Sequence, residues 1–279
     1  MVSDKVCVIT GANTGIGLAT ARELARQGAQ LVLACRSRDK TERVIEEMKQ
    51  ASGNPAIDFL SLDLASLDQV RTAAAELLGR GHPIHLLINN AGLGGQRGLT
   101  TDGFELHFGV NHLGHFLFTQ LLLDRIREST PARIVTVASQ SHYGARGIDW
   151  DAVRRRTRTI TGMREYGVSK LANVLHAAEL GRRLAGTGVT TYSLHPGVIA
   201  SDIWRRMPFP ARQIARAFMK STEDGARTTL YCATAPELAN ETGQYYDDCA
   251  AKQPSRSARD PELAAELWRR SEAWTTARA

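Results

Sequence analysis

The residues Thr10-Gly11-Ala12-Asn13-Thr14-Gly15-Ile16-Gly17 follow the apolar run Val6 to Ile9 and precede an amphipathic stretch from Ile16 to Gln27. Glycines at such a turn allow the backbone to approach a pyrophosphate closely. A helix that begins there directs free N–H groups and its dipole at the anion. Glycine spacing alone would also suit an ordinary turn of an α/β protein. The strand–loop–helix setting favours a dinucleotide-binding turn.

The same alternation of short apolar runs and longer periodic stretches continues along the chain. Most of the runs lack polar alternation, as strands covered on both faces do. After Val6 to Ile9, the predicted strands lie at 31–34, 57–60, 84–88, 134–137, 189–194 and 244–246, and helices are predicted at 40–51 and 67–78. Strand–helix alternation gives right-handed βαβ units and a parallel sheet. The prediction is an α/β, doubly wound parallel sheet of about seven strands with helices on both faces.

Length and composition exclude several classes of protein. The chain has 279 residues, 43% of them hydrophobic and 23% charged, which is ordinary for a globular protein and rules out disordered or collagen-like chains. The formal net charge of +6 is too small to indicate nucleic-acid binding. The four cysteines form no CxxC pair, and no apolar run could span a bilayer. We expect a cytoplasmic protein with reduced thiols, no metal, no membrane span and no signal peptide.

The glycine-rich turn and five further features occur in a fixed order and carry a family resemblance. They are Thr10 to Gly17, Asn89-Asn90-Ala91-Gly92, Asn111, Ser139, Tyr166-Gly167-Val168-Ser169-Lys170 and Pro196-Gly197. This order resembles the short-chain dehydrogenase/reductase family over essentially the whole chain. The resemblance implies one Rossmann-fold domain, residues 1–279, a nicotinamide dinucleotide cofactor and a small-molecule substrate.

Other stretches are similar to the retinol dehydrogenase-like branch of that family. They are Gly109 to Phe116, Arg133-Ile134-Val135, His195-Pro196-Gly197, Tyr246-Asp247-Asp248-Cys249, and the ending Ala258-Arg259-Asp260 with Leu267-Trp268. The branch contains membrane-anchored retinoid enzymes and soluble relatives with other substrates. We expect a soluble member, either monomeric or homo-oligomeric.

The resemblance implies four catalytic residues, Asn111, Ser139, Tyr166 and Lys170. Tyr166 and Lys170 are four residues apart on a predicted helix and therefore share a face. A cation beside a phenol should lower its pKa, so that Tyr166 can exchange a proton with the substrate oxygen while Lys170 also holds the ribose. Ser139, preferred over Ser141, would orient that oxygen, and Asn111 would support a proton relay. The Arg154 to Arg158 run before Tyr166 is expected to be a solvated, mobile face.

The resemblance also implies a cofactor-binding set at the carboxyl ends of the strands. It comprises Gly11, Asn13, Thr14, Gly15, Ile16, Gly17, Arg36, Asp63, Leu64, Asn90, Ala91, Gly92, Tyr166, Lys170, Pro196, Gly197, Val198 and Ser201. His107, His112 and His115 match no zinc motif and are interpreted as helix packing, without a metal.

The end of the second predicted strand favours NADP(H) over NAD(H). Cys35 stands where an NAD enzyme of the family carries an acidic residue, and Arg36 follows it, with Arg38 nearby. A guanidinium binds a phosphate through paired charge-assisted bonds, whereas a carboxylate would repel it. We therefore expect an NADP(H)-dependent oxidoreductase that interconverts a ketone or aldehyde and an alcohol, with reduction favoured.

The substrate is expected to be small and hydrophobic. Residues 198–220 would form a lid, with Trp204, Met207 and Phe209 facing the substrate. Two alternatives remain open: a dinucleotide-sensing regulator without catalytic activity, and a protochlorophyllide-type reductase with a similar Tyr-Lys pair.

Overall fold

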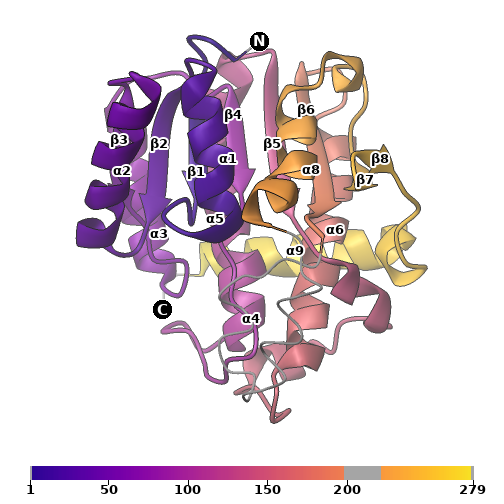
Figure 1. Cartoon of the computed structure of the whole chain (residues 1–279). Helices are drawn as coiled ribbons and strands as arrows, with labels where there is room; N and C mark the ends of the chain where they lie inside the picture. Colours follow the sequence, from indigo (N-terminus) through magenta and orange to yellow (C-terminus); the bar gives the residue numbers. More distant parts are fainter. Residues whose placement is uncertain (1, 198–220, 278–279) are drawn as a thin grey trace.

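One sheet organises the computed structural model, which describes residues 2–197 and 221–277 (Figure 1). Within these residues the strand order is β3-β2-β1-β4-β5-β6-β7-β8. The strands are β1 (Val6–Thr10), β2 (Gln30–Cys35), β3 (Ile57–Ser61), β4 (Leu86–Asn89), β5 (Ala132–Val137), β6 (Val189–His195), β7 (Gln244–Asp247) and β8 (Ala250–Ala251). The first seven pair in parallel, which confirms the predicted doubly wound sheet. The two-residue β8 adds an antiparallel edge that the sequence did not reveal.

Helices cover both faces of the sheet because its strands alternate apolar residues between two cores. Val8 of β1 lies in one core, whereas its neighbours Cys7 and Ile9 lie in the other. Helices α3 (Leu67–Gly79), α5 (Gly114–Glu128), α6 (Met163–Arg183) and α9 (Pro261–Thr276) cover the first face. Helices α1 (Gly15–Arg26), α2 (Arg38–Ser52) and α8 (Thr222–Thr234) cover the second.

The helix ends follow signals that can be read in the sequence. Asp260 caps α9 by accepting hydrogen bonds from the N–H groups of Glu262 and Leu263, and Pro261 occupies the first helical position. Ser66 caps α3 in the same way. Gly53 ends α2 in the left-handed conformation, with φ of 68°. These caps fix where the helices start and stop, and so the positions of the loops at the sheet edge.

The long helix that runs from Leu106 to Glu128 contains an irregular turn near its start. It begins as α4 (Leu106–Phe108), continues as a π-helical turn (Gly109–Leu113) and ends as α5. A π turn shifts the side chains that follow it to a different face of the helix. It also leaves some carbonyl groups without their usual helical hydrogen-bond partner. Asn111 lies within this turn.

The segment between β5 and α6 is longer than a simple connection and is anchored to the body. It contains two short helical turns, η2 (Gln140–Gly144) and η3 (Ala152–Arg154). The arginines from 154 to 158 are exposed, as predicted, but the Arg154 guanidinium stacks on Phe104 at 4.1 Å. Thr157, in the middle of the run, is buried and bonded to the Glu105 carboxylate. The segment is therefore held in place from the start of the long helix.

The predicted lid lies outside the described residues. Val198, Ser201, Trp204, Met207 and Phe209 all belong to that stretch, 198–220.

Candidate active site

A cavity of about 550 Å³ opens at the carboxyl ends of β1 to β4. This edge of a parallel sheet is where doubly wound folds bind ligands. The lining residues come from the glycine-rich loop, the ends of β2 and β3, and the segment after β4. They are Gly11, Asn13, Thr14, Ala34, Cys35, Arg36, Ser37, Lys40, Leu62, Asp63, Leu64, Ala91, Gly92, Leu93, Gly94, Gln96 and Val110.

The glycine-rich loop packs too closely for side chains. A Cβ on Gly17 would lie 2.4 Å from the Asn90 amide nitrogen and 2.5 Å from the carbonyl oxygen of Gly11. The Asn90 amide donates to the carbonyls of Thr10, at 2.9 Å, and Gly11, at 3.3 Å. Helix α1 starts beside this loop, its Thr14 side chain makes no capping hydrogen bond, and its first turn has no acidic residue. The first N–H groups of α1 thus suit an anion.

Eight of the predicted cofactor residues line the cavity. They are Gly11, Asn13, Thr14, Arg36, Asp63, Leu64, Ala91 and Gly92. Gly15, Ile16 and Gly17 form the start of α1, and the Asn90 side chain supports the loop. Pro196 and Gly197 follow β6, and Val198 and Ser201 lie beyond the described residues.

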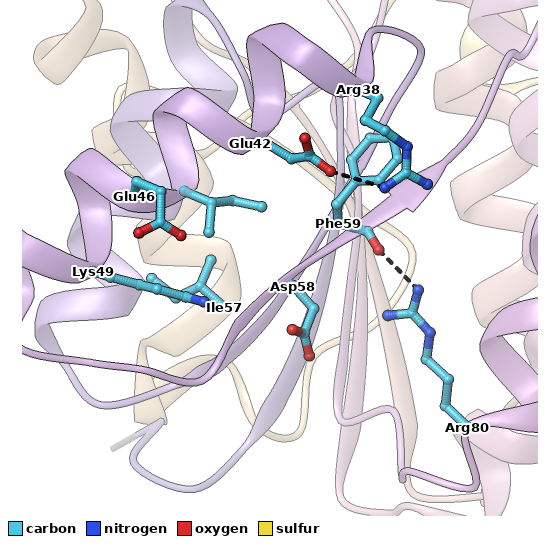
Figure 2. Close-up of a pocket in the computed structure, with 9 residues that line it drawn as sticks. Arg38, Glu42, Glu46, Lys49, Ile57, Asp58, Phe59 and Arg80 are labelled. Carbon is cyan, nitrogen blue, oxygen red and sulfur yellow. Dashed lines mark hydrogen bonds and ion pairs between the residues drawn. The ribbon is translucent and has the colours of Figure 1, made fainter.

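Lys40 also lines the cavity, and the sequence analysis did not identify it. It lies in the first turn of α2, four residues after Arg36, and only the folded start of that helix shows that both residues line the same cavity. Arg38 lies elsewhere. Figure 2 shows its guanidinium over the Phe59 ring, at 4.5 Å, and paired with Glu42 at 2.9 Å in a neighbouring groove. Among the residues that the structure describes, the two cations that line the cavity are Arg36 and Lys40.

The four predicted catalytic residues come from three places, the π turn for Asn111, the segment after β5 for Ser139 and helix α6 for Tyr166 and Lys170. All are buried, with exposures of 0% for Asn111, 8% for Ser139, 6% for Tyr166 and 3% for Lys170. The Asn111 amide donates to the Leu93 carbonyl at 3.0 Å and to the Ser169 hydroxyl at 2.9 Å, and accepts from the Leu93 N–H at 2.9 Å. It thereby ties the π turn to the segment after β4 and to helix α6.

Ser139 forms a hydrogen bond with the side chain of Tyr166. A hydrogen bond with Ser139 lowers the pKa of Tyr166, although burial raises it more strongly, so that the pKa stays above its ordinary value. Ser139 also accepts a bond from the Ser141 N–H at 3.2 Å, which fixes its position after β5. The serine and the phenol therefore meet, although 27 residues separate them in sequence (166 − 139).

Lys170 lies between the tyrosine and the sheet. Its Nζ is 5.6 Å from the centroid of the Tyr166 ring and donates to the Val137 carbonyl at 2.8 Å. A Cβ on Gly92 would lie 3.5 Å from Nζ and 3.4 Å from the Asn111 Oδ1, so this glycine adjoins both groups. Burial lowers the pKa of Lys170 to about 7.

The expectation that a neighbouring cation lowers the pKa of Tyr166 is corrected here. The pKa of Tyr166 is raised, because desolvation of the phenolate outweighs the stabilising contacts. Tyr166 is therefore a protonated phenol at neutral pH, a form that can donate a proton.

Neither a metal-binding cluster nor a membrane-spanning helix occurs in the part of the chain that the structure describes. Across residues 2–197 and 221–277, no three His, Cys, Asp or Glu side chains gather in a way that could hold a metal ion. In the same residues, no helix has both the length and the apolar character needed to cross a bilayer.

Comparison with known proteins places this geometry in a family. The short chain dehydrogenase model matches residues 5–150. Retinol dehydrogenase 12 of Mus musculus is 44% identical over 270 residues, covering 96% of this chain and 85% of that protein. Retinol dehydrogenase 13 of Homo sapiens is 42% identical, covering 97% and 84%. A crystal structure of an uncharacterized protein from Mycobacterium Paratuberculosis superposes with a TM-score of 0.79 at 35% identity, covering 98% and 94%. The chain thus belongs to the short-chain dehydrogenase family and is similar to its retinol dehydrogenases.

Proposed function

We propose that this chain is an NADP(H)-dependent oxidoreductase that reduces a ketone or aldehyde to an alcohol. The observation that carries the proposal is the connection from β2 into α2, where Arg36 and Lys40 line the cavity and no described carboxylate of that connection does. Family membership supports an oxidoreductase acting on a CH–OH group and a nicotinamide dinucleotide. The choice between NAD and NADP rests on this chain's own residues.

Arg36 and Lys40 are exposed at the cavity, and neither forms an ion pair with a described residue. Two uncommitted cations suit a phosphate on the ribose, because charge-assisted bonds to phosphate are stronger than bonds to a hydroxyl. Asp63 is the one carboxylate among the lining residues of this cavity. It belongs to the end of β3, and its Oδ1 accepts from the Ala65 N–H at 2.9 Å. Cys35 provides no charge, since burial raises the pKa of its thiol.

The remaining lining suits the rest of a dinucleotide. The tight approach at Gly17 and the open start of α1 would hold the pyrophosphate, and Asp63 with Leu64 would adjoin the adenine. Ala91 and Gly92 would adjoin the nicotinamide ribose, beside Lys170. When bound, the dinucleotide supplies the hydride.

The buried side chains would manage the proton. Tyr166, protonated at neutral pH, would donate its proton to the carbonyl oxygen, and the Ser139 hydroxyl would orient that oxygen and stabilise its developing charge. Lys170 would hold the ribose and return a proton towards Tyr166, and Asn111 would keep the surrounding backbone in place. Reduction as the working direction is inferred from the proposed preference for NADP(H).

The remaining parts of the proposal rest on the sequence. Residues 198–220, with Trp204, Met207 and Phe209, would close over a small hydrophobic substrate. The four cysteines are free and three are buried, which supports a reducing, cytoplasmic location.

The test is the ratio of the dissociation constants for NADH and NADPH. The wild-type protein should bind NADPH more tightly than NADH. Arg36→Ser and Lys40→Ser should each weaken the binding of NADPH, by about 1.5–3 kcal/mol at most, and leave the binding of NADH unchanged. The matched control is Arg38→Ser, which removes a cation two residues from Arg36 that faces Phe59. That variant should keep the wild-type ratio. A wild type that binds NADH as tightly as NADPH would overturn the cofactor assignment.

A further inference from the structure

His115 connects the helix that contains Asn111 to the glycine-rich loop. It follows the π turn at the start of α5 and is 2% exposed. Its Nδ1 lies 3.1 Å from the carbonyl oxygen of Asn111, and its Nε2 lies 2.8 Å from the Thr10 hydroxyl. The two contacts reach from the π turn to the last residue of β1.

The contacts of His115 allow one neutral tautomer. The Asn111 carbonyl can only accept, so Nδ1 must carry the proton, and Nε2 must then accept from the Thr10 hydroxyl. With its proton committed to Nε2, the Thr10 oxygen is free to accept from the N–H groups of Asn90, at 3.0 Å, and Ala91, at 2.9 Å. An alternative acceptor for the Thr10 proton, the Ile88 carbonyl, is more distant at 3.5 Å.

These bonds close a ring around the end of β4. Asn90 and Ala91 bond to Thr10, Thr10 to His115, and His115 to the backbone of Asn111. The Asn111 side chain then bonds both the N–H and the carbonyl of Leu93, which returns to Ala91 along the chain. The enclosed residues include Gly92, which adjoins Lys170.

We propose that His115 is a positioning residue. Its imidazole bridges the Asn111 carbonyl and the Thr10 hydroxyl, and this bridge holds the turn after β4 between the cofactor cavity and the catalytic residues. This inference rests on the proposed function. A ring of buried hydrogen bonds resists small displacements, because any broken member leaves an unsatisfied buried group. His115 thus acts through Asn111 and Ala91 without touching the substrate.

Two variants separate the two bonds of the ring. His115→Asn retains an amide N–H near the position of Nδ1 but loses the acceptor for Thr10. His115→Gln places its amide near Nε2 but loses the donor to Asn111. We expect His115→Asn to weaken NADPH binding about fivefold, with a smaller effect on kcat. We expect His115→Gln to lower kcat about fivefold, with a smaller effect on NADPH binding. Each fivefold change corresponds to the loss of about one hydrogen bond. His115→Phe should show both losses.

The matched control is His112→Phe. His112 is buried in the same helix and bonds Ser271 at 3.0 Å, away from the ring. The His112→Phe variant also removes a buried histidine, but it should leave kcat and NADPH affinity near their wild-type values. Equal effects of His112→Phe and His115→Phe would overturn the proposal, since His115 would then act as ordinary core.

A double-mutant cycle tests whether His115 acts through Thr10. Thr10→Val removes the hydroxyl, so adding His115→Asn should weaken NADPH binding no further. Additive losses would contradict the ring. These affinities do not depend on turnover. If wild type reduces no carbonyl, the proposed function fails while the coupling of His115 to Thr10 is still measured.

Nitrogen-15 NMR of the wild-type imidazoles needs no variant to fold. His115 should be the neutral tautomer protonated at Nδ1, the less common form in water. An Nε2-protonated or doubly protonated His115 at neutral pH would break the ring and overturn the proposal.

Discussion

The two halves of the cavity edge differ in how deeply their polar groups are buried. At the ends of β2 and β3, the charged groups are exposed: Arg36 and Lys40 extend from the surface beside a backbone loop. Beyond β4, the polar groups are buried, and the pKa values of Tyr166 and Lys170 are shifted by desolvation. We call these the nucleotide half and the catalytic half.

The two halves differ in how much their polar groups reduce the stability of the folded protein. Exposed cations cost the folded state little, and each influences affinity through charge. Buried polar groups must be held by partners, and a buried ammonium destabilises the folded protein. Substitutions in the nucleotide half should therefore change cofactor affinity with little effect on stability, whereas substitutions in the catalytic half should change turnover and stability together.

The largest expected effect is that of Tyr166→Phe. The substitution removes the transferable proton and keeps the ring, so kcat should fall by about 10²–10⁴-fold. The dissociation constant for NADPH should stay near wild type, measured by fluorescence titration. The control is Tyr143→Phe, because Tyr143 is a half-exposed tyrosine whose hydroxyl bonds the Gln253 carbonyl. Turnover in Tyr166→Phe equal to that of the control would remove Tyr166 from the mechanism.

Lys170→Met should lose activity and gain stability. Burial lowers the pKa of Lys170 to about 7, so the folded protein binds this proton less well than the unfolded chain does. The destabilisation is full below about pH 7 and decreases as the pH rises towards the ordinary lysine value. The Val137 carbonyl would still accept from Asn173 at 3.3 Å. We expect a Tm increase of about 2 °C or more at pH 7, smaller at pH 9.

Lys40→Met serves as the comparison in the nucleotide half. Because Lys40 is exposed, its loss should change stability by no more than about 0.5 kcal/mol while weakening NADPH binding. A Lys170→Met variant that melts several degrees below wild type would show that the buried ammonium stabilises the fold, contrary to this account.

The buried histidines control the stability of the fold in acid. Burial lowers the pKa of His112, of His115 to about 3 and of His176 to about 4. Below pH 6.5 the unfolded chain binds protons that these folded histidines do not, so stability should fall as the pH decreases from 6.5 towards 4. Each histidine contributes up to about 1.4 kcal/mol per pH unit.

Urea unfolding at pH 7, 6 and 5 measures this slope. His176→Phe should reduce it, whereas exchange of the exposed His82 for Gln should leave it unchanged. The same slope in His176→Phe as in wild type would contradict the assignment of acid sensitivity to the buried histidines.

Much of the architecture could be predicted from the sequence because its signals are local. Apolar runs such as Leu31 to Ala34 marked buried parallel strands, and the caps at Ser66 and Asp260 lie within a few residues of their helices. The order of Asn111, Ser139, Tyr166 and Lys170 indicated one site, and the structure brings these side chains together.

What the sequence could not supply depends on contacts between distant elements. Lys40 and Arg38 are two residues apart, and only the packing of α2 against β3 directs Arg38 to Phe59 and Lys40 to the cavity. His115 was interpreted as packing because its partners, Thr10 and Asn111, meet only around the π turn. The raised pKa of Tyr166 reflects burial, which the Tyr-Lys spacing does not reveal.

Hydride transfer from labelled cofactor tests the central claim most directly. NADPH deuterated at the transferring position would be supplied to the wild-type protein with a panel of hydrophobic ketones and aldehydes. We predict an alcohol with deuterium at the carbinol carbon, in one-to-one proportion to NADPH oxidised, and product formation that is about 10²–10⁴-fold slower in Tyr166→Phe. Tight NADPH binding with no deuterium in any alcohol would contradict it and favour a dinucleotide-sensing protein.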